Sequence, residues 1–509
     1  MTPHQRRPPG HGDIAALRSR MDGLEGRTTA VEQKNASQAA ARGMLNDRAK
    51  KVQGEVDDLR YIISGGSGRK ALTTTASAFR ASANSALLIR SGRKVLTTTA
   101  SSAKGSSRSA MLQKTGSSGS YYNALNICHG DGATDDTNHI LAAISSYKAA
   151  GQAGVYFPAG TYKLSTRLVV PDSSVLVGAG IGSVHLKGPL SFGDNSSFSD
   201  MKIGTPGTST QSAATATGTS FNRCQFRGGG GSLGSNDTAV VYLAGDVSHL
   251  RFEDCNIEVN FGTGTGDTSF NSVAVWPNLS GTSVHNILFH GCHFGVSNGV
   301  STVAPRFHVE IYEDHHAGTR TTGTREFNFE DCIFEAAASA SIDYSGSTLS
   351  SDNETPNCGY SHITGCIFKG NGAGSDQEYC NDITAEDGAG YLTITGNTFY
   401  RGYLCAFASF KNSYGGHNIF SDNTIDATNA VLNTGITHWE GLAYIRIASH
   451  YNTITNNTMN TWTENRALEL MTGGNNNTIT GNTITSPDGS DSIVINGGNN
   501  NNISGNTYL

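Results

Sequence analysis

A six-residue phrase, apolar–x–x–Cys/Asn–x–apolar, recurs from the middle of this 509-residue chain to its last residues. Its fourth position, the slot, is occupied in order by Met201 (a weak match), Cys224, Cys255, Cys292, Cys332, Cys366, Asn397, Asn423, Asn457, Asn482 and Asn506. Successive slots lie 23 to 40 residues apart. A repeat that tolerates such insertions and still restores one slot is typical of a solenoid, whose turns bury apolar residues against neighbouring turns. The strand-like alternation around each slot, with Gly, Asn and Ser between, predicts a β-solenoid.

The slot residues indicate how the interior is packed. Stacked Asn side chains can hydrogen-bond along the column, as in the ladders of stacked sheets. Cys in the same slot behaves as a small buried hydrophobe. The spacings do not match those of a zinc-binding knuckle, so packing is favoured over a metal ladder. Nine Cys in all, five of them in one column, argue against a disulfide framework and predict free, buried thiols.

The net charge of −6 conceals two oppositely charged regions. Residues 1–120 carry 20 Lys and Arg against 8 Asp and Glu, a net +12, and residues 121–509 carry 16 against 34, a net −18. No DNA-binding motif accompanies the basic region, so we expect it to dock to other proteins and not to nucleic acid. No apolar stretch reaches the ~20 residues of a membrane span, so we expect no membrane insertion. The first residues contain no apolar core of a secretory signal.

The basic region divides into two segments. Residues 1–64 show heptad spacing from Ile14 to Ile63, apolar at both ends and polar in the middle, which predicts an oligomeric coiled coil used for attachment. Residues 65–120 contain two copies of a Ser/Thr-rich repeat, at 67–77 and 91–101. Two such copies cannot bury a core alone, so this connector is either a flexible linker or ordered by packing on neighbours; we favour the second.

Residues 121–509 resemble a known superfamily. The segment 128–137 (CHGDGATDDT), a helical stretch to about Ala150 and the segment 154–162 (GVYFPAGTY) look like the entry of the pectate-lyase-like β-helices. The likeness is greatest to bacteriophage tailspikes and tail fibres. Asp135 or Asp136 is suited to cap the helix that begins near Thr137, and we favour this over a metal or acid–base role.

The resemblance implies an all-β fold, a right-handed parallel β-helix, preceded here by the α-helical coiled coil. It also implies a virion protein of the phage tail, extracellular after host lysis, that adsorbs to the host surface by binding envelope polysaccharide. A homotrimer that contacts other tail or baseplate proteins through its basic N-terminal region is the expected assembly. No cofactor or metal is expected. Whether the protein is also an enzyme stays open, with a glycoside hydrolase or polysaccharide lyase as the alternative.

Chemistry on a β-helix is sought on the outward-facing strand positions, since alternate side chains of each strand point outward. We predict one outer column with the candidate catalytic residues Glu310, Asp343, Asp382 and Glu386. The predicted substrate-binding residues are Trp276, His308, Tyr312, Tyr444 and Arg446. Carboxylates one or two coils apart would stand roughly 5 to 10 Å apart, the range used by glycosidases.

The competing interpretation is that outward acidic residues only keep the sheet soluble. The residue set of polygalacturonase-like enzymes is absent from the coils, and no calcium cluster of the pectate lyase type is evident. Residues 313–316 (EDHH) resemble metal ligands but precede a loop signal, so we interpret them as a solvated turn. The sequence therefore predicts glycan binding more firmly than it predicts catalysis.

Overall fold

The computed structural model describes the chain in segments that fall into two units, Met1–Ala110 and Met111–Leu509. The described residues are 87–91, 94–98, 120–205, 211–228, 239–259, 271–275, 283–296, 305–312, 325–335, 337, 340–346, 358–369, 381–386, 388–400, 405–409, 416–426, 443–460, 466–485, 493–495 and 497–509. In the first unit they form one antiparallel hairpin, β1 (Leu87–Ser91) with β2 (Lys94–Thr98). The predicted coiled coil at 1–64 lies outside the described residues, as does most of the 65–120 connector.

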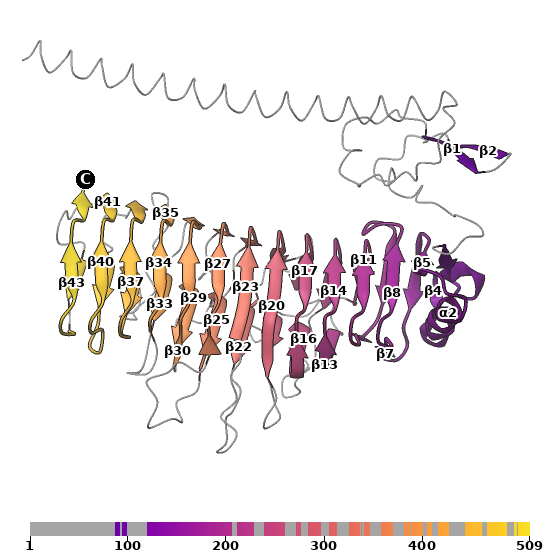
Figure 1. Ribbon diagram of the computed structural model, residues 1–509, viewed down its shortest axis with the longest axis horizontal. Helices are drawn as coiled ribbons and strands as arrows, with labels where there is room; N and C mark the ends of the chain where they lie inside the picture. Colours follow the sequence, from indigo (N-terminus) through magenta and orange to yellow (C-terminus); the bar gives the residue numbers. More distant parts are fainter. Residues whose placement is uncertain are drawn as a thin grey trace, which may run out of the picture. The chain divides into compact units, whose positions relative to one another are not determined.

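The second unit is a parallel β-helix with three stacks of strands (Figure 1). Stack 1 consists of β7 (Leu168–Val169), β10 (Leu190–Ser191), β13 (Gln211–Thr217), β16 (Ala239–Ser248), β19 (Asn271–Val275), β22 (Phe307–Tyr312), β25 (Ala340–Ser345), β29 (Asn381–Glu386), β33 (Cys405–Ser409), β36 (Ala443–Ile447), β39 (Arg466–Leu470) and β42 (Ile493–Ile495). Stack 2 consists of β3 (Tyr121–Asn123), β5 (Gly154–Phe157), β8 (Val175–Gly178), β11 (Ser197–Ser199), β14 (Ser220–Asn222), β17 (Arg251–Glu253), β20 (Val284–His290), β23 (Arg325–Glu330), β27 (His362–Thr364), β31 (Thr393–Thr395), β34 (Ile419–Ser421), β37 (Thr453–Thr455), β40 (Thr478–Thr480) and β43 (Asn502–Ser504). Two short strands, β26 (Cys358–Gly359) and β30 (Ala389–Gly390), pair beside it, and β16 pairs with both stacks.

Stack 3 is a separate sheet on the other side of the slots. It consists of β4 (Asp131–Asp135), β6 (Gly160–Lys163), β9 (Val184–Lys187), β12 (Lys202–Ile203), β15 (Gln225–Gly228), β18 (Asn256–Val259), β21 (His293–Val296), β24 (Ile333–Phe334), β28 (Ile367–Phe368), β32 (Thr398–Tyr400), β35 (Thr424–Asp426), β38 (Thr458–Asn460), β41 (Thr483–Thr485) and β44 (Thr507–Tyr508). The predicted solenoid is thus confirmed. Its right-handed coiling, expected for parallel crossover connections, stays a prediction.

The slot phrase sets the register of the whole solenoid. The apolar residue three positions before each slot pairs in stack 2 with its counterpart one coil on, from Phe198–Phe221 to Ile479–Ile503. The apolar residue two positions after each slot does the same in stack 3. The aromatic members stack face to face, as Phe252 does on Phe289 with ring centroids 4.7 Å apart. Each coil therefore adds one layer to a continuous apolar core.

The turn into each slot requires left-handed backbone. Every residue that immediately precedes a slot has a positive φ, for example Asp254 at 52° and Asn456 at 58°. Gly, Asn and Asp tolerate this conformation best, and they fill ten of these eleven positions. The exception, Arg223, donates two hydrogen bonds of 2.7 Å to the Asp200 carboxylate one coil before. The Gly/Asn/Asp punctuation seen in the sequence is thus a backbone requirement of the turn.

The five Cys of the slot column are free and buried, as predicted. The thiol of each of the last four points to a main-chain carbonyl one coil before, as Cys292 Sγ does to Phe252 O at 3.2 Å. Burial raises the pKa of the Cys224, Cys292 and Cys366 thiols. Although burial opposes it, hydrogen bonds with neighbouring slot thiols lower the pKa of Cys255 and Cys332. A buried, neutral thiol is chemically inert because the thiolate is the nucleophile.

We therefore expect Cys224, Cys255, Cys292, Cys332 and Cys366 to resist alkylation in the folded protein and to react in guanidinium chloride, because only unfolding exposes them to solvent. Peptide mass spectrometry after a short iodoacetamide pulse measures the labelling at each site. Rapid native labelling at any of the five would contradict this packing.

The Asn slots form the hydrogen-bonded ladder that the sequence predicts. Asn457 Oδ1 accepts from the main-chain N–H and the Nδ2 of Asn423 at 2.9 and 3.1 Å, and Asn457 Nδ2 donates to Phe420 O at 2.9 Å. A second ladder, which sequence reasoning missed, runs through Asn418, Asn452, Asn477 and Asn501. Its members stand five residues before the Asn slots, and this spacing is the sequence signal that would have found them.

Helix α2 (Thr137–Ala149) is the helical stretch expected in the entry motif, and it covers the first coil. It lies at the N-terminal end of the row of strands in Figure 1 and buries Ile140, Ala143 and Ile144 in the core. The Tyr147 hydroxyl donates to Ser173 O at 3.1 Å and accepts from Val175 N–H at 3.0 Å, which fixes the helix to the next coil. Among the described residues, no helix is long and apolar enough to cross a membrane.

Candidate active site on the outer face

The outer face of stack 1 is polar and buried where β19, β22, β25 and β29 lie side by side. The register aligns Ala274, Glu310, Asp343 and Thr384 in one outward column. Glu310 is 8% exposed and Asp343 is 3% exposed. The competing interpretation, that outward acidic residues only keep the sheet soluble, does not fit these two buried positions. Burying carboxyl groups costs free energy unless they are neutral or hydrogen-bonded, so this face is not ordinary sheet surface.

Three carboxyl groups meet there, and we refer to Glu310, Asp343 and Glu386 as the carboxylate cluster. The Ser345 hydroxyl lies 3.0 Å from Asp343 Oδ2 and 2.9 Å from Glu386 Oε1. A hydroxyl has a single proton, so both contacts are hydrogen bonds only if one of the two carboxyl groups is protonated. Asn271 Nδ2 donates to Glu310 Oε2. Glu386 is half-buried and connects the cluster to solvent.

The surroundings favour neutral acids in this cluster. Burial raises the pKa of Glu310 to about 7, against the opposing effects of the Arg306 charge and the Asn271 hydrogen bond. Burial also raises the pKa of Asp343, and the charges of Glu386 and Glu310 raise it further. Asp343 Oδ1 is buried and has no hydrogen-bond partner among the described residues. Asp343 is therefore the better proton donor and Glu310 the better base.

The raised pKa of Glu310 predicts a pH-dependent stability. Between the ordinary pKa of 4.5 and about 7, the folded state holds a proton on Glu310 that the unfolded chain has lost. Stability therefore falls as pH rises through this interval, by up to about 3 kcal/mol at 1.36 kcal/mol per pKa unit. We expect Glu310→Gln to remove this loss, so that urea unfolding at pH 8 shows a more stable variant. Equal stability of wild type and variant at pH 8 would contradict the buried, neutral Glu310.

The single predicted column requires correction at β29. Ala340 pairs with Asn381 and Ile342 with Ile383, so Asp382 lies opposite Ser341, in the column of His308. Glu386 lies opposite Ser345, one column to the other side, and its Oε1 lies 2.9 Å from the serine hydroxyl. Strand alternation alone cannot distinguish positions 382, 384 and 386, because all three face outward.

The predicted binding residues are internal or outside the described residues. His308 is fully buried, with Nδ1 3.2 Å from Ser272 Oγ and Nε2 2.8 Å from Glu335 O. Tyr444 and Arg446 are each 1% exposed, and Arg446 Nε donates to Glu469 Oε2 at 3.1 Å. The expectation that these three form an exposed sugar-binding surface is therefore wrong. Trp276, the side chain of Tyr312 and the 313–316 turn lie outside the described residues.

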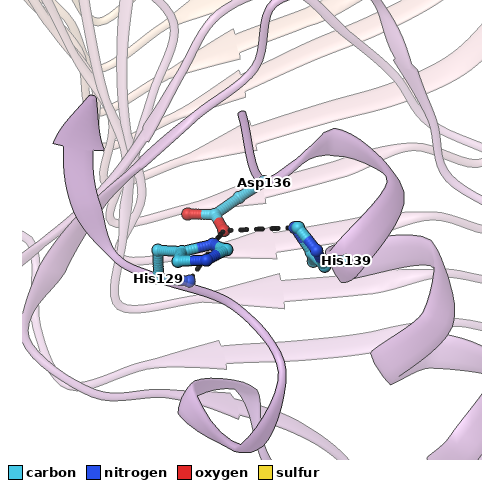
Figure 2. A group of neighbouring side chains, drawn as sticks. All are labelled: His129, Asp136 and His139. Carbon is cyan, nitrogen blue, oxygen red and sulfur yellow. Dashed lines mark hydrogen bonds and ion pairs between the residues drawn. The ribbon is translucent and has the colours of Figure 1, made fainter. Parts of the chain in front are cut away.

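The entry motif gathers His129, Asp136 and His139 (Figure 2). The Asp136 carboxylate is fully buried and accepts hydrogen bonds from the main-chain N–H groups of His129 and Gly130 at 2.7 and 3.0 Å. Nδ1 of His129 lies 3.2 Å from Asp136 Oδ1, and Nδ1 of His139 lies 3.7 Å from the same oxygen. Both imidazoles thus converge on one carboxylate oxygen.

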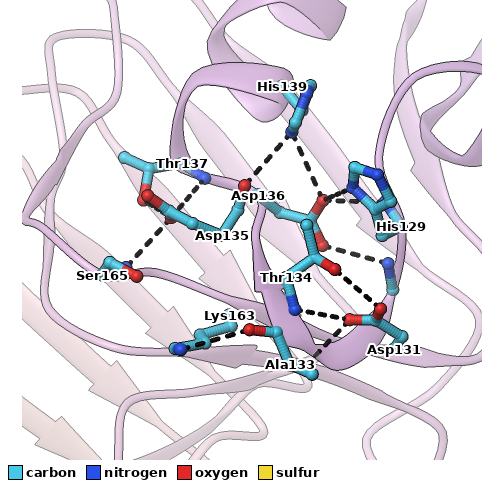
Figure 3. Close-up of polar contacts among 11 residues, drawn as sticks. His129, Asp131, Ala133, Thr134, Asp135, Asp136, Thr137, His139, Lys163 and Ser165 are labelled. Atoms are coloured by element: carbon cyan, nitrogen blue, oxygen red, sulfur yellow. Dashed lines mark hydrogen bonds and ion pairs between the residues drawn. The ribbon is translucent and has the colours of Figure 1, made fainter.

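Helix capping, the role that we favoured for the acidic pair, falls to Asp135 (Figure 3). Its Oδ1 accepts from Thr137 N–H at 3.0 Å, Thr137 Oγ1 at 2.6 Å and Ser165 N–H at 3.1 Å. These bonds lower the pKa of Asp135. Asp136 occupies the N-cap position but makes no side-chain capping bond, because its carboxylate turns toward the 129–130 loop.

The comparisons with known proteins agree with this fold. Residues 128–359 match the family model described as "Rhamnogalacturonase A/epimerase, pectate lyase-like". The matched range begins in the entry motif and includes Glu310 and Asp343, and it ends before Glu386.

Individual relatives match short or divergent portions. The mannuronan C5-epimerase AlgE3 of Azotobacter vinelandii is 45% identical over 65 residues, which are 11% of this chain and 4% of the relative. Alginate lyase 7 of the same organism is 40% identical over 65 residues, 11% of this chain and 8% of the relative. The structure of PfbA, a surface adhesin of Streptococcus pneumoniae, aligns with 75% of this chain and 90% of its own at 14% identity and a TM-score of 0.48.

Proposed function

We propose that the β-helix binds a polysaccharide across the outer face of stack 1 and cleaves it at the carboxylate cluster. The main support for this proposal is that three carboxyl groups from three successive coils lie together. Two of them, Glu310 and Asp343, are buried, and the pKa of each is raised. Perturbed acids gathered at one site are typical of acid–base catalysis. The pectate-lyase-like match and the names of the two relatives matched over 65 residues, an epimerase of mannuronan and an alginate lyase, support the substrate class.

The proposed reaction is hydrolysis of a glycosidic bond. Asp343 gives its proton to the glycosidic oxygen as the C–O bond breaks, and the Glu310 carboxylate attacks the anomeric carbon to form a glycosyl ester. Water, losing a proton to Asp343, then releases the sugar and restores Glu310. The two residues are register neighbours on strands about 4.8 Å apart, which favours the closer carboxyl spacing of retaining enzymes.

Product analysis with the intact chain tests the proposal. We would incubate it in ¹⁸O water with two substrates: a neutral envelope polysaccharide and alginate. The net charge of −18 over residues 121–509 disfavours a polyanion, so we expect oligosaccharides mainly from the neutral glycan, each with one ¹⁸O at a retained anomeric centre. If neither substrate releases an oligosaccharide, the proposed cleavage at the outer face of stack 1 is contradicted.

We further propose that the protein acts in a phage tail, where the same face adsorbs the virion to host envelope polysaccharide. This proposal rests on the tailspike-like entry motif and on the basic, heptad-patterned residues 1–64, suited to a trimeric coiled coil that docks to tail or baseplate proteins. It places the protein outside the cell after host lysis.

Truncation tests that attachment. We expect a chain that lacks residues 1–64 to keep the strand-rich circular dichroism of the β-helix and to be missing from purified virions, because the docking segment is gone. Immunoblots of particles assembled with full-length and truncated chains measure incorporation. Equal incorporation of both chains would show that attachment resides elsewhere.

A further inference from the structure

We infer that His129, Asp136 and His139 form a binding site for a divalent transition metal ion such as Zn²⁺, which fastens helix α2 to the loop before β4. This inference is independent of the proposed activity. The donor set consists of two imidazole nitrogens and one carboxylate oxygen, all within 4.8 Å of one another. Two His with one carboxylate is a known ligand set for zinc, with a further position left for water.

The spacing of the donors fits one ion. Ligands about 2.0 to 2.1 Å from a tetrahedral metal stand roughly 3.3 Å from one another. The two distances from Nδ1 to Asp136 Oδ1, 3.2 Å for His129 and 3.7 Å for His139, lie on either side of this value. Figure 2 shows both rings directed toward that oxygen from opposite segments, the loop and the first turn of the helix. Only small ring movements are needed to close the coordination.

The surroundings hold the carboxylate in position for this role. The main-chain N–H of His129 donates to Asp136 Oδ1 and that of Gly130 donates to Oδ2, and these bonds orient the carboxylate, as hydrogen bonds to metal-bound carboxylates usually do. The His129 and His139 side chains are 46% and 41% exposed, so an ion has access from solvent.

Two protein contacts compete with a metal here. Nδ1 of His129 is within hydrogen-bonding distance of Asp136 Oδ1, and Nδ1 of His139 lies 3.2 Å from Asp135 O. Metal binding through Nδ1 would replace both of these contacts, and each imidazole would then carry its proton on Nε2.

Local charge favours a cation in spite of the helix. The N-terminus of a helix carries about half a positive charge, which by itself repels a metal ion. The full negative charge of Asp136, with Asp131 and Asp135 in the same turn, exceeds it (Figure 3). The main-chain N–H groups of Ala133 and Thr134 each donate to Asp131 Oδ1 at 2.8 Å, which holds this carboxylate in the turn.

The test uses the full chain, freed of metal by dialysis against a chelator, and isothermal titration with Zn²⁺. We expect one site that weakens at least tenfold in His139→Gln and in His129→Gln. Zn²⁺ should raise the melting temperature of the wild type by mass action and leave that of the double variant unchanged. The matched control is His315→Gln with His316→Gln, which alters another histidine pair and should bind Zn²⁺ as the wild type does.

Each outcome decides the question. Loss of the site in the His129 and His139 variants, with circular dichroism unchanged, supports the metal site. Absence of Zn²⁺ binding by the wild type overturns it. Binding that survives both substitutions, or that disappears in the His315 and His316 control, overturns it as well, because the ion is then held elsewhere.

Discussion

Replacing either member of the Glu310–Asp343 pair is expected to lower kcat/KM for the cleaved polysaccharide by about 10²- to 10⁴-fold, the usual contribution of general acid–base groups. Glu310→Gln removes the nucleophile and Asp343→Asn removes the proton donor, each with little change in volume. Because Glu310 acts ionised and its pKa is about 7, wild-type kcat/KM should rise with pH through about 7. It should fall again at higher pH as Asp343 loses its proton. Reducing-end assays across pH 5 to 10 measure both effects.

The control for these variants is Asp382→Asn, another buried outward carboxyl group on the same stack. The register places Asp382 opposite Ser341, outside the Glu310–Asp343 column, so its substitution should change kcat/KM by less than tenfold. Thermal unfolding of all three variants separates loss of catalysis from loss of fold. If Asp382→Asn inactivates a folded protein while Asp343→Asn does not, the catalytic site lies in the column of Asp382 and not in the Glu310–Asp343 column.

Asn457→Ala is expected to destabilise the solenoid by about 4 kcal/mol. The substitution removes the acceptor for two buried donors of Asn423 and the donor to Phe420 O and Asn482 Oδ1. Each buried polar group left without a partner costs about 1–3 kcal/mol. The shift in the guanidinium midpoint of the transition that reports on the C-terminal coils measures the loss.

Asn460→Ala is the matched control. It is the same substitution three residues on, at a half-buried outer position of β38. We expect less than 0.5 kcal/mol for this surface change. Comparable destabilisation by both variants would show that the ladder contributes nothing beyond the general cost of removing Asn.

The register of the coils could be predicted because the slot is defined by interior chemistry. Each coil must place one small or amide side chain between two inward apolar residues, and insertions leave that requirement unchanged. The Phe289–Cys292–Phe294 unit illustrates this, since all three residues lie in the positions that the phrase assigns. The second Asn ladder was also present in the sequence, as Asn five residues before four of the five Asn slots.

The outer face of stack 1 could be predicted only in part. Strand alternation determines whether a side chain points outward, but it determines neither how buried that side chain is nor the column in which it lies. It placed Glu310 and Asp343 outward and in register, and the structure confirms both. It could not show that Ser345 links Glu386 to Asp343, since that bridge depends on a one-column offset at β29. Nor could it show that His308 lies 2.8 Å from Glu335 O and that Arg446 donates to Glu469, both inside the protein. Burial depends on three-dimensional surroundings that no local pattern records.

The most direct test of the carboxylate cluster as the glycan site is amide hydrogen exchange of the folded Asp343→Asn chain with and without an oligosaccharide that the wild type has released. Binding across three coils should slow exchange in residues 307–312, 340–345 and 381–386, the strands that carry the cluster. The account predicts slower exchange in these strands and little change in stack 3. Slower exchange confined to stack 3, or none at saturating oligosaccharide, would contradict it.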